Sequence, residues 1–167
     1  MAQSTARSAG TNRRDSVFAA LEVIPDRWSA LVLREAFFGV RRFSDFRRSL
    51  GIARNTLTDR LNRFVEQGVL EKQRIADTNE WEEYRLTEMG LDLYPATVAL
   101  MQWGDRWRAP EGPPLRLTHK ECGGELALEL SCGRCGAQLD AQDASYEPGP
   151  GAADGRRRRS GHASTRP

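Results

Sequence analysis

Residues 52–68, IARNTLTDRLNRFVEQG, decide the fold of this chain. Apolar side chains recur in this stretch at positions i, i+4, i+7 and i+8, which places them on one face of a helix. They are Leu57, Leu61, Phe64 and Val65. Asn55 is a residue type that caps helix N-termini, and Gly68 suits the left-handed conformation that follows a helix. The pattern therefore predicts a helix over residues 55–67.

The polar side of this predicted helix carries groups that bind DNA in the major groove. There, Arg can donate to guanine acceptors, and Thr can contact a thymine methyl or a phosphate. The candidates for contact with base edges or the adjacent backbone are Arg54, Asn55, Thr56, Thr58, Asp59, Arg60 and Arg63. A surface helix with a solvated charged face explains the segment equally well when it is taken alone, so the neighbouring segments decide between the two interpretations.

A second short helix is expected just before residue 52. Ser44 can cap the segment SDFRRSL, which stops at Gly51, and Phe43 lies in a short extended link. With the tight turn at 51–54, the two helices make a helix-turn-helix, whose first helix crosses the DNA backbone while the second enters the groove. Four arginines are then expected near phosphates, with a solvated rim as the alternative: Arg41, Arg42, Arg47 and Arg48.

Charge is distributed unevenly along the chain, although the net charge is only +2. Positions 34–63 hold eight arginines against three acidic residues, a local charge of +5. Positions 66–105 hold nine acidic residues against three basic ones, a local charge of −6. Clustered positive charge is typical of a surface that binds a polyanion. Composition is that of a soluble globular protein, and without an apparent signal sequence or apolar span we expect a cytoplasmic location.

Two more helices are expected on the N-terminal side. The first can be capped by Asp15 or Ser16 and ends before Pro25. The second runs from about residue 29 to 38, and Trp28 at its start is expected to anchor the core.

The hydrophobic period changes from helical to two after Gly68. VLEKQRI at 69–75 and WEEYRL at 81–86 are predicted strands that flank the turn cluster DTNE. A hairpin directly after the second helix of a helix-turn-helix is a wing. The predicted fold class is therefore mainly α with a small β-hairpin (α+β), a winged helix-turn-helix.

The last predicted helix covers residues 88–107, EMGLDLYPATVALMQWGDRW, and Thr87 can cap it. Pro95 should kink or restart this helix, because proline lacks the amide hydrogen that a helix interior requires. The apolar side of the helix is broad and includes Trp103 and Trp107. One small domain offers little core for it to cover, so we expect a second subunit and paired reading helices.

About residues 16–107 resemble the HxlR family of bacterial winged-helix transcriptional regulators, which is related to the MarR-type regulators. The matching segments, in order, are RW at 27–28, RRFSDFRRSL at 41–50, LTDRLNRFVEQGVL at 57–70, YRLTEMG at 84–90 and WG at 103–104. The resemblance implies a homodimer built from the first and last helices, a palindromic DNA site and repressor or activator activity. The implied dimer residues are Val17, Phe18, Leu21, Leu91, Tyr94, Val98 and Met101.

Two departures from the family pattern bear on mechanism. Redox-sensing members carry a cysteine near the start of the first helix, where this chain has Asp15 and Ser16. The wing tip of the family is usually basic, whereas DTNEWEE at 77–83 is acidic and should repel phosphate. We expect weak engagement of the wing with DNA, with Arg74 and Arg85 as the phosphate contacts if it does engage.

A second module follows a linker at 109–114 and covers residues 115–140. His119 and Cys122 form H-x-x-C, and Cys132 and Cys135 form C-x-x-C. Two such pairs suit one tetrahedral, structural zinc ion in a zinc-ribbon-like β-hairpin, while a metal-free hairpin and a redox cysteine pair are the alternatives. The remaining segments, 1–14 and 141–167 with its run of four Arg at 156–159, are predicted to be disordered.

The leading functional prediction is a homodimeric, sequence-specific transcriptional regulator, expected to be a repressor, with residues 15–108 as its DNA-binding and dimerisation domain. Double-stranded DNA and a second copy are its expected partners; a small-molecule effector is possible in principle, but no residue pattern names one. The alternative is a protein-interaction module built on the same fold. An enzyme is not expected, because no nucleophile in the sequence has an evident base beside it.

Overall fold

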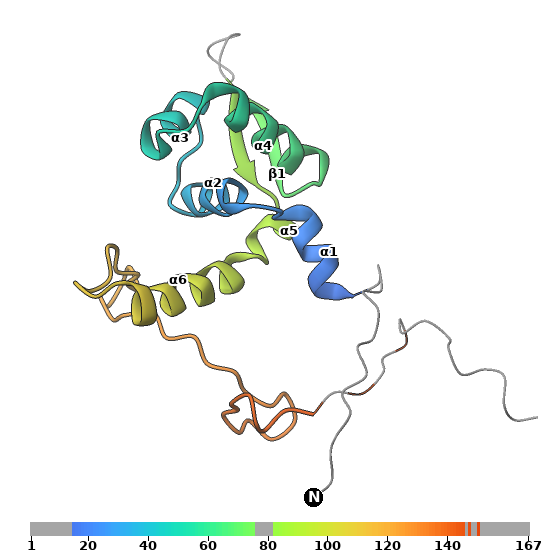
Figure 1. Ribbon diagram of the computed structural model, residues 1–167, viewed down its shortest axis with the longest axis vertical. Helices are drawn as coiled ribbons and strands as arrows, with labels where there is room; N and C mark the ends of the chain where they lie inside the picture. The colour runs from blue at the N-terminus through green and yellow to red at the C-terminus, as the bar shows by residue number, and fades with distance from the viewer. Residues whose placement is uncertain (1–14, 76–81, 146, 148–149, 151–167) are drawn as a thin grey trace, which may run out of the picture.

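The structure is a computed structural model and describes residues 15–75, 82–145, 147 and 150. Its elements, in chain order (Figure 1), are α1 (Ser16–Val23), α2 (Arg27–Phe37), α3 (Phe43–Leu50), α4 (Arg54–Glu66), β1 (Leu70–Arg74), β2 (Glu82–Leu86), α5 (Glu88–Leu91) and α6 (Tyr94–Arg108). They confirm an α-rich winged helix-turn-helix with a small antiparallel sheet of two strands. None of the helices in these ranges is long and apolar enough to span a bilayer.

One apolar core joins α2, α3, α4 and the hairpin. The predicted seam of α4 is confirmed, because Leu57, Leu61 and Phe64 are fully buried. These side chains meet Phe46 of α3, and the rest of the cluster comes from Val32, Leu33, Ala36, Ile52, Val69, Leu70 and Tyr84. Burying one such large apolar side chain stabilises the fold by about 1.5–3 kcal/mol. The core therefore determines which side of α4 remains outside.

Helix α4 does not begin where the sequence pattern predicted. Its N-cap is Ala53, and Asn55 lies inside the first turn, so the prediction of Asn55 as the cap was wrong. The carbonyl of Ala53 accepts from the Leu57 amide at 3.0 Å, which closes the first turn two residues before Asn55 could do so. Gly68, with φ of +72°, follows the helix in the predicted left-handed conformation.

Helix α3 also begins earlier than predicted. The Arg42 carbonyl accepts from the amides of Asp45 and Phe46 at 3.0 and 3.1 Å, so Phe43 already has helical geometry. Ser44 therefore lies in the first turn and does not cap it. The predicted end of the helix is confirmed, since Gly51 follows Leu50 with φ of +59°.

Aspartates cap both N-terminal helices. The Asp15 carboxylate accepts from the Val17 amide at 2.7 Å, as predicted for α1. Helix α2 begins at Arg27, two residues earlier than predicted, because Asp26 caps it in the same way. Trp28 packs half-buried against the core, which confirms its predicted anchoring position.

The hairpin and α5 are joined through Thr87. Strands β1 and β2 pair antiparallel in a register that sets Leu70 opposite Leu86. The Thr87 hydroxyl accepts from the Gly90 amide at 3.1 Å, as the predicted cap, and donates to the Gly68 carbonyl at 2.6 Å. A Cβ at Gly90 would lie 2.2 Å from the Val69 carbonyl oxygen, so only glycine permits this close approach of α5 to the chain before β1.

The last predicted helix is divided into two. Helix α5 ends at Leu91, and α6 starts again at Tyr94 with Pro95 in its first turn, so Pro95 restarts the helix as one of the two predicted outcomes. Figure 1 shows α6 on the side of α2 that faces away from α3 and α4. The helix-turn-helix formed by α3 and α4 and the long helix α6 thus lie on opposite sides of α2.

The C-terminal module differs from its prediction. In place of one β-hairpin, residues 117–126 and 130–139 form two separate turns, each closed by a single isolated β-bridge, Thr118 to Glu125 and Ser131 to Gln138. The predicted wing tip at 77–80, residues 1–14 and most of 141–167 lie outside the described residues.

Candidate nucleic-acid interface

One face of α4 is open to solvent. Arg54, Asn55, Thr58 and Asp59 are exposed, as predicted, whereas Thr56 is half-buried. The Thr58 hydroxyl already donates to the Arg54 carbonyl at 3.0 Å, so its methyl group is the part that remains for a thymine contact. Sequence analysis missed Asn62, which is exposed one turn after Thr58. Positions 55, 58, 59 and 62 lie at helical spacing and form the open face of α4.

Arg60 does not belong to this open face. Its Nε lies 2.8 Å from Oδ2 of Asp26, the residue that caps α2. Partial burial acts to raise the pKa of Asp26, but hydrogen bonds from the Ser29 and Trp28 amides and the charge of Arg60 outweigh it and lower this pKa. The base contact by Arg60 stays a prediction, and in this structure the guanidinium pairs with Asp26 of the same chain.

Arg63 is also turned towards the protein. Its Nη2 donates to the backbone carbonyl of Glu22 in α1, and its side chain is half-buried. Arg60 and Arg63 together, named here the inner arginines, tie α4 to the chain around α1 and the start of α2. The base contact by Arg63 also stays a prediction, and in this structure one of its nitrogens donates to a carbonyl of the same chain.

Three arginines line a hollow where α3 approaches the first turn of α4. Arg47, Arg48 and Arg54, named here the outer arginines, line it together with Phe43 and Ser44. The Arg54 guanidinium carbon lies 5.7 Å from the centre of the Phe43 ring, a cation–π contact that orients the side chain. Arg48 pairs with Asp45 at 2.6 Å within α3. The hollow is therefore lined by three arginines, one of which is paired with an acidic side chain.

The start of α4 strengthens this anion preference. Its cap, Ala53, has no side-chain oxygen to bond the free amides of the first turn. A helix N-terminus carries a partial positive charge and exposed N–H groups, which favour phosphate. Because Arg54 extends from the same turn, backbone and side-chain donors converge there.

A partly buried ion pair helps to position α3. Glu35 is 5% exposed, and its carboxylate lies 2.7 Å from Arg34 and accepts a hydrogen bond from the Ser49 hydroxyl at the end of α3. Sequence analysis missed this cluster, because only the packing of α2 against α3 brings Ser49 to the neighbouring residues Arg34 and Glu35. The outer arginines are therefore carried by a helix whose position is fixed by polar as well as apolar contacts.

The basic residues around the wing have acidic partners. Arg85 lies 2.9 Å from Glu83, Arg42 lies 3.9 Å from the same carboxylate, and Lys72 lies 3.5 Å from Glu82. Arg74 is exposed at the end of β1. The phosphate contacts predicted for Arg42, Arg74 and Arg85 stay predictions, and the ion pairs to Glu83 reduce the charge that two of them would offer.

Arg41 has a structural position. Its Nη1 donates to the carbonyls of Ala36 and Val40 at 2.6 and 3.1 Å, and its own carbonyl accepts from the Tyr84 amide at 2.8 Å. It closes the end of α2 onto β2, and the phosphate contact predicted for Arg41 stays a prediction.

An extensive apolar surface lies on α1, α5 and α6. Val17, Leu21 and Leu91 are exposed, while Phe18, Tyr94 and Met101 are half-buried. Val98 is only 4% exposed, so little of its side chain is open to the predicted dimer contact. Sequence analysis omitted Leu100, which is 67% exposed, from that list; Trp103 and Trp107 are 56% and 62% exposed.

The four predicted metal ligands occupy two turns. His119 Nδ1 lies 3.2 Å from Cys122 Sγ in the first turn. In the second turn, the backbone amides of Cys135 and Arg134 and the Cys135 thiol donate to the Cys132 sulfur, which lowers the pKa of that thiol. Within the described residues, no three candidate ligands gather at one point, so the predicted four-ligand cluster is not assembled in this conformation.

Comparison with known proteins agrees with this architecture. The sequence profile of the HxlR-like helix-turn-helix family matches residues 23–112. An uncharacterized HTH-type transcriptional regulator of Mycobacterium tuberculosis is 49% identical over 138 residues, which cover 82% of this chain and 87% of that protein. Its close counterpart in Mycobacterium bovis matches to the same extent.

Solved structures show the same fold. PA1607, provisionally described as a transcription factor, superposes with a TM-score of 0.74 at 37% identity and covers 80% of this chain and 94% of its own. PA1374 of Pseudomonas aeruginosa, described in the same way, gives a TM-score of 0.60 at 33% identity, with coverages of 81% and 93%. The reduced form of the redox regulator HypR gives 0.53 at 28% identity, with coverages of 57% and 95%.

Proposed function

This chain belongs to the HxlR-like helix-turn-helix family of DNA-binding transcriptional regulators, and we propose that it is a homodimeric repressor that reads a palindromic operator with α4. The observation that carries the proposal is the pairing of the open face of α4 with the outer arginines beside its N-terminus. In a helix-turn-helix, the N-terminal residues of the second helix contact base edges while neighbouring groups contact phosphates. Asn55 is then the leading base reader, because Asn can bond adenine through two edge atoms.

Dimerisation is supported by the apolar side chains left outside the core. Leu100, Trp103 and Trp107 on α6 and Val17 and Leu21 on α1 are all more than half exposed. A monomer seldom exposes so much apolar surface, and a two-fold pairing would cover it and set two copies of α4 on one face of DNA. Repression requires only occupancy, since a dimer seated in successive major grooves excludes other proteins from the same DNA.

The first test is a selection of genomic fragments by the purified protein, followed by gel shifts on the recovered sequence. We expect a two-fold symmetric site that competes better than random DNA by about a thousand-fold or more. A reporter gene placed behind the site should fall in expression when the protein is present. Binding with no sequence preference would contradict the proposal and favour the protein-interaction alternative.

The second test concerns the dimer. Trp103→Asp should shift the mass measured by light scattering from two chains towards one, because a charge would have to be buried in an apolar contact. Arg27→Asp, on an exposed position of α2, is the control and should leave the mass unchanged. A parent protein that is monomeric at the concentrations where it binds DNA would contradict the homodimer.

A further inference from the structure

The two C-terminal turns are copies of one backbone design, thirteen residues apart. In the first, the His119 carbonyl accepts from the Gly123 amide at 2.8 Å, and the His119 amide donates to the Gly124 carbonyl at 2.8 Å. In the second, Cys132 makes the same two bonds with Gly136 and Ala137, both at 2.8 Å. The two turns therefore share backbone hydrogen bonds that the spacing of the ligand residues does not reveal.

The likeness extends to the edges and glycines of both turns. Leu126 donates to the Leu117 carbonyl at 3.0 Å, and Leu139 donates to the Leu130 carbonyl at 2.8 Å, so each turn is closed at its base by a leucine pair. Gly123 and Gly136 have φ of +70° and +73°. Each glycine follows the second candidate ligand of its turn, where a left-handed residue lets the chain fold back around the pair.

Each turn presents half of a tetrahedral donor set. The first offers an imidazole nitrogen and a sulfur that lie 3.2 Å apart, and the second offers two sulfurs. Nitrogen and sulfur donors in the ratio of one to three are a structural zinc set, with bond lengths of about 2.0–2.3 Å.

We propose that one Zn²⁺ ion joins the two turns of a single chain through His119 Nδ1 and the sulfurs of Cys122, Cys132 and Cys135. The ion replaces the three thiol protons, which pass to solvent, and imidazole binds in its neutral form. Because four protein donors fill the coordination sphere, the ion has a structural role.

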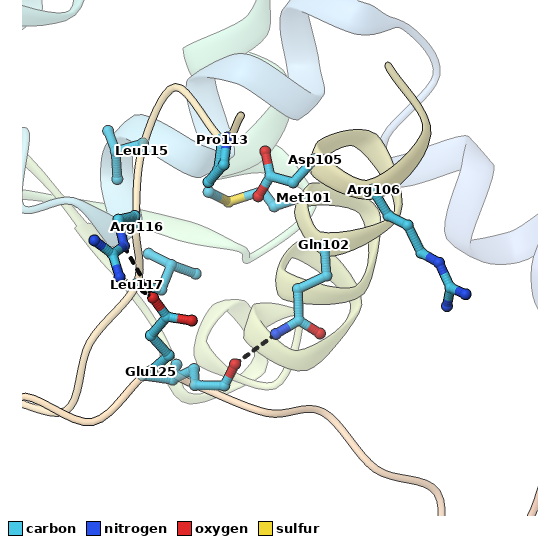
Figure 2. Close-up of a pocket in the computed structure, with 10 residues that line it drawn as sticks. Met101, Gln102, Asp105, Arg106, Pro113, Leu115, Arg116, Leu117 and Glu125 are labelled. Atoms are coloured by element: carbon cyan, nitrogen blue, oxygen red, sulfur yellow. Dashed lines mark hydrogen bonds and ion pairs between the residues drawn. The ribbon is translucent and has the colours of Figure 1, made fainter. Parts of the chain in front are cut away.

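The first turn is the anchored half of the site. Gln102 of α6 donates to the Leu126 carbonyl at 2.7 Å, and Arg116 pairs with Glu125 across the same turn (Figure 2). In the described chain, every hydrogen bond recorded for residues 130–143 joins two residues of that same segment. Assembly of the four ligands around one ion therefore requires the second turn to move onto the first.

The connection between the turns permits that movement. Only residues 127–129 separate Leu126 from Leu130, and all three are exposed, as is Leu130, so a change of their backbone angles breaks no buried contact. Closure can also cover Leu128 and Leu130, which are 41% and 68% exposed. A tether this short holds the second turn at an effective concentration of about millimolar, which favours a site within one chain over one shared between chains.

The experiment measures zinc bound to the full chain, purified under reducing conditions from zinc-supplemented cells and desalted. We expect one zinc per chain in the parent and in the control variants Lys120→Ala and Ser131→Ala. Cys122→Ser, Cys132→Ser, Cys135→Ser and His119→Ala should each bind far less. Replacement by Co²⁺ should give the intense visible bands of a tetrahedral thiolate site in the parent and lose them in Cys132→Ser.

Several results would overturn the proposal. These are a zinc-free parent, a disulfide between Cys132 and Cys135 in protein kept under reducing conditions, or equal zinc in the parent and Cys132→Ser. The readout does not involve DNA, so its outcome is independent of the proposed repressor function.

A mixed-chain experiment tests whether the site lies in one chain. A chain carrying His119→Ala and Cys122→Ser is co-produced with one carrying Cys132→Ser and Cys135→Ser, and the mixed assemblies are isolated by two affinity tags. We expect no zinc, because neither chain keeps both turns. Zinc in the mixed assembly would contradict a site within one chain, since only a shared site can combine the two intact turns.

Discussion

The inner and outer arginines of the helix-turn-helix share one chemistry but face different surroundings. The inner pair, Arg60 and Arg63, meets a carboxylate and a carbonyl near α1 and α2, and both side chains are half-buried. The outer arginines line a solvent-facing hollow beside an uncapped helix N-terminus. The difference teaches that residue type does not distinguish an arginine that packs against its own chain from one that stays open to solvent.

The largest expected effect comes from removing the outer arginines together. Arg47→Ala, Arg48→Ala and Arg54→Ala combined should weaken binding to operator and random DNA alike by about 4 kcal/mol or more, at roughly 1.5 kcal/mol for each charged contact. The slope of log K against log salt should fall by about 3. Gel shifts over a salt series measure both quantities.

The control for this variant changes the net charge equally at a distance from α3 and α4. Arg106→Ala, Lys120→Ala and Arg134→Ala combined should leave the salt slope close to that of the parent. Equal losses in the two triple variants would show that net charge, and not the hollow beside α4, attracts DNA.

The next effect separates base reading from phosphate contact. Asn55→Ala should cost about 1–3 kcal/mol on the operator and little on random DNA, because the residue lies on the open face of α4 and carries no charge. Competition gel shifts with operator and random DNA measure the two losses. Glu66→Ala, at the exposed far end of the same helix, is the control. An equal loss of affinity for both DNAs would show that Asn55 does not contact base edges.

A smaller effect is expected for the inner arginines, and mainly on stability. Arg60→Ala should lower the free energy of unfolding, and the double-mutant cycle with Asp26→Ala should give a coupling of about 0.5–1 kcal/mol, as for a partly exposed ion pair. Urea unfolding supplies the four free energies. The salt slope of DNA binding should stay unchanged in Arg60→Ala; a slope lowered by about 1 would instead place Arg60 on a phosphate.

The smallest effect is the pH dependence of the same ion pair. The pKa of Asp26 in the folded protein lies below its ordinary value of 3.8. Its contribution to stability is therefore complete above that ordinary value and is lost as pH falls through the lowered folded pKa. Unfolding measured from about pH 6 to about pH 3 should show a shallower acid limb in Asp26→Asn than in the parent. Parallel acid limbs would contradict the lowered pKa.

Local patterns predicted the framework because local forces determine it. The spacing of Leu57, Leu61 and Phe64 located the buried seam of α4, since a helix must bury its apolar side. Gly51 and Gly68 marked helix ends, and Thr87 marked a helix start, since capping involves only near neighbours in sequence. The family resemblance gave the same order of elements and the same class of function.

The structure departs from the sequence predictions where contacts with residues distant in the sequence determine burial or the start of a helix. Val98 lies at a position that helical spacing assigns to an exposed apolar side, yet the chain covers it. Asn55 and Ser44 are good capping residues, but the helices start two residues earlier than caps at those positions require, because Ala53 and Arg42 supply the first carbonyls. Capping propensity indicates which residue types suit an N-cap, whereas the packing of the helix determines which residue occupies that position.

The amino-acid sequence by itself determined the winged helix-turn-helix, the buried side of α4 and the presence of two ligand pairs near the C-terminus, because helical period, turn residues and ligand spacing are short-range properties. Only the tertiary structure decided which arginines of α4 remain available, because Asp26 and Glu22 reach Arg60 and Arg63 across more than thirty positions of sequence. It also revealed the matching turns around His119 and Cys132, since their hydrogen bonds depend on the folded path of the backbone.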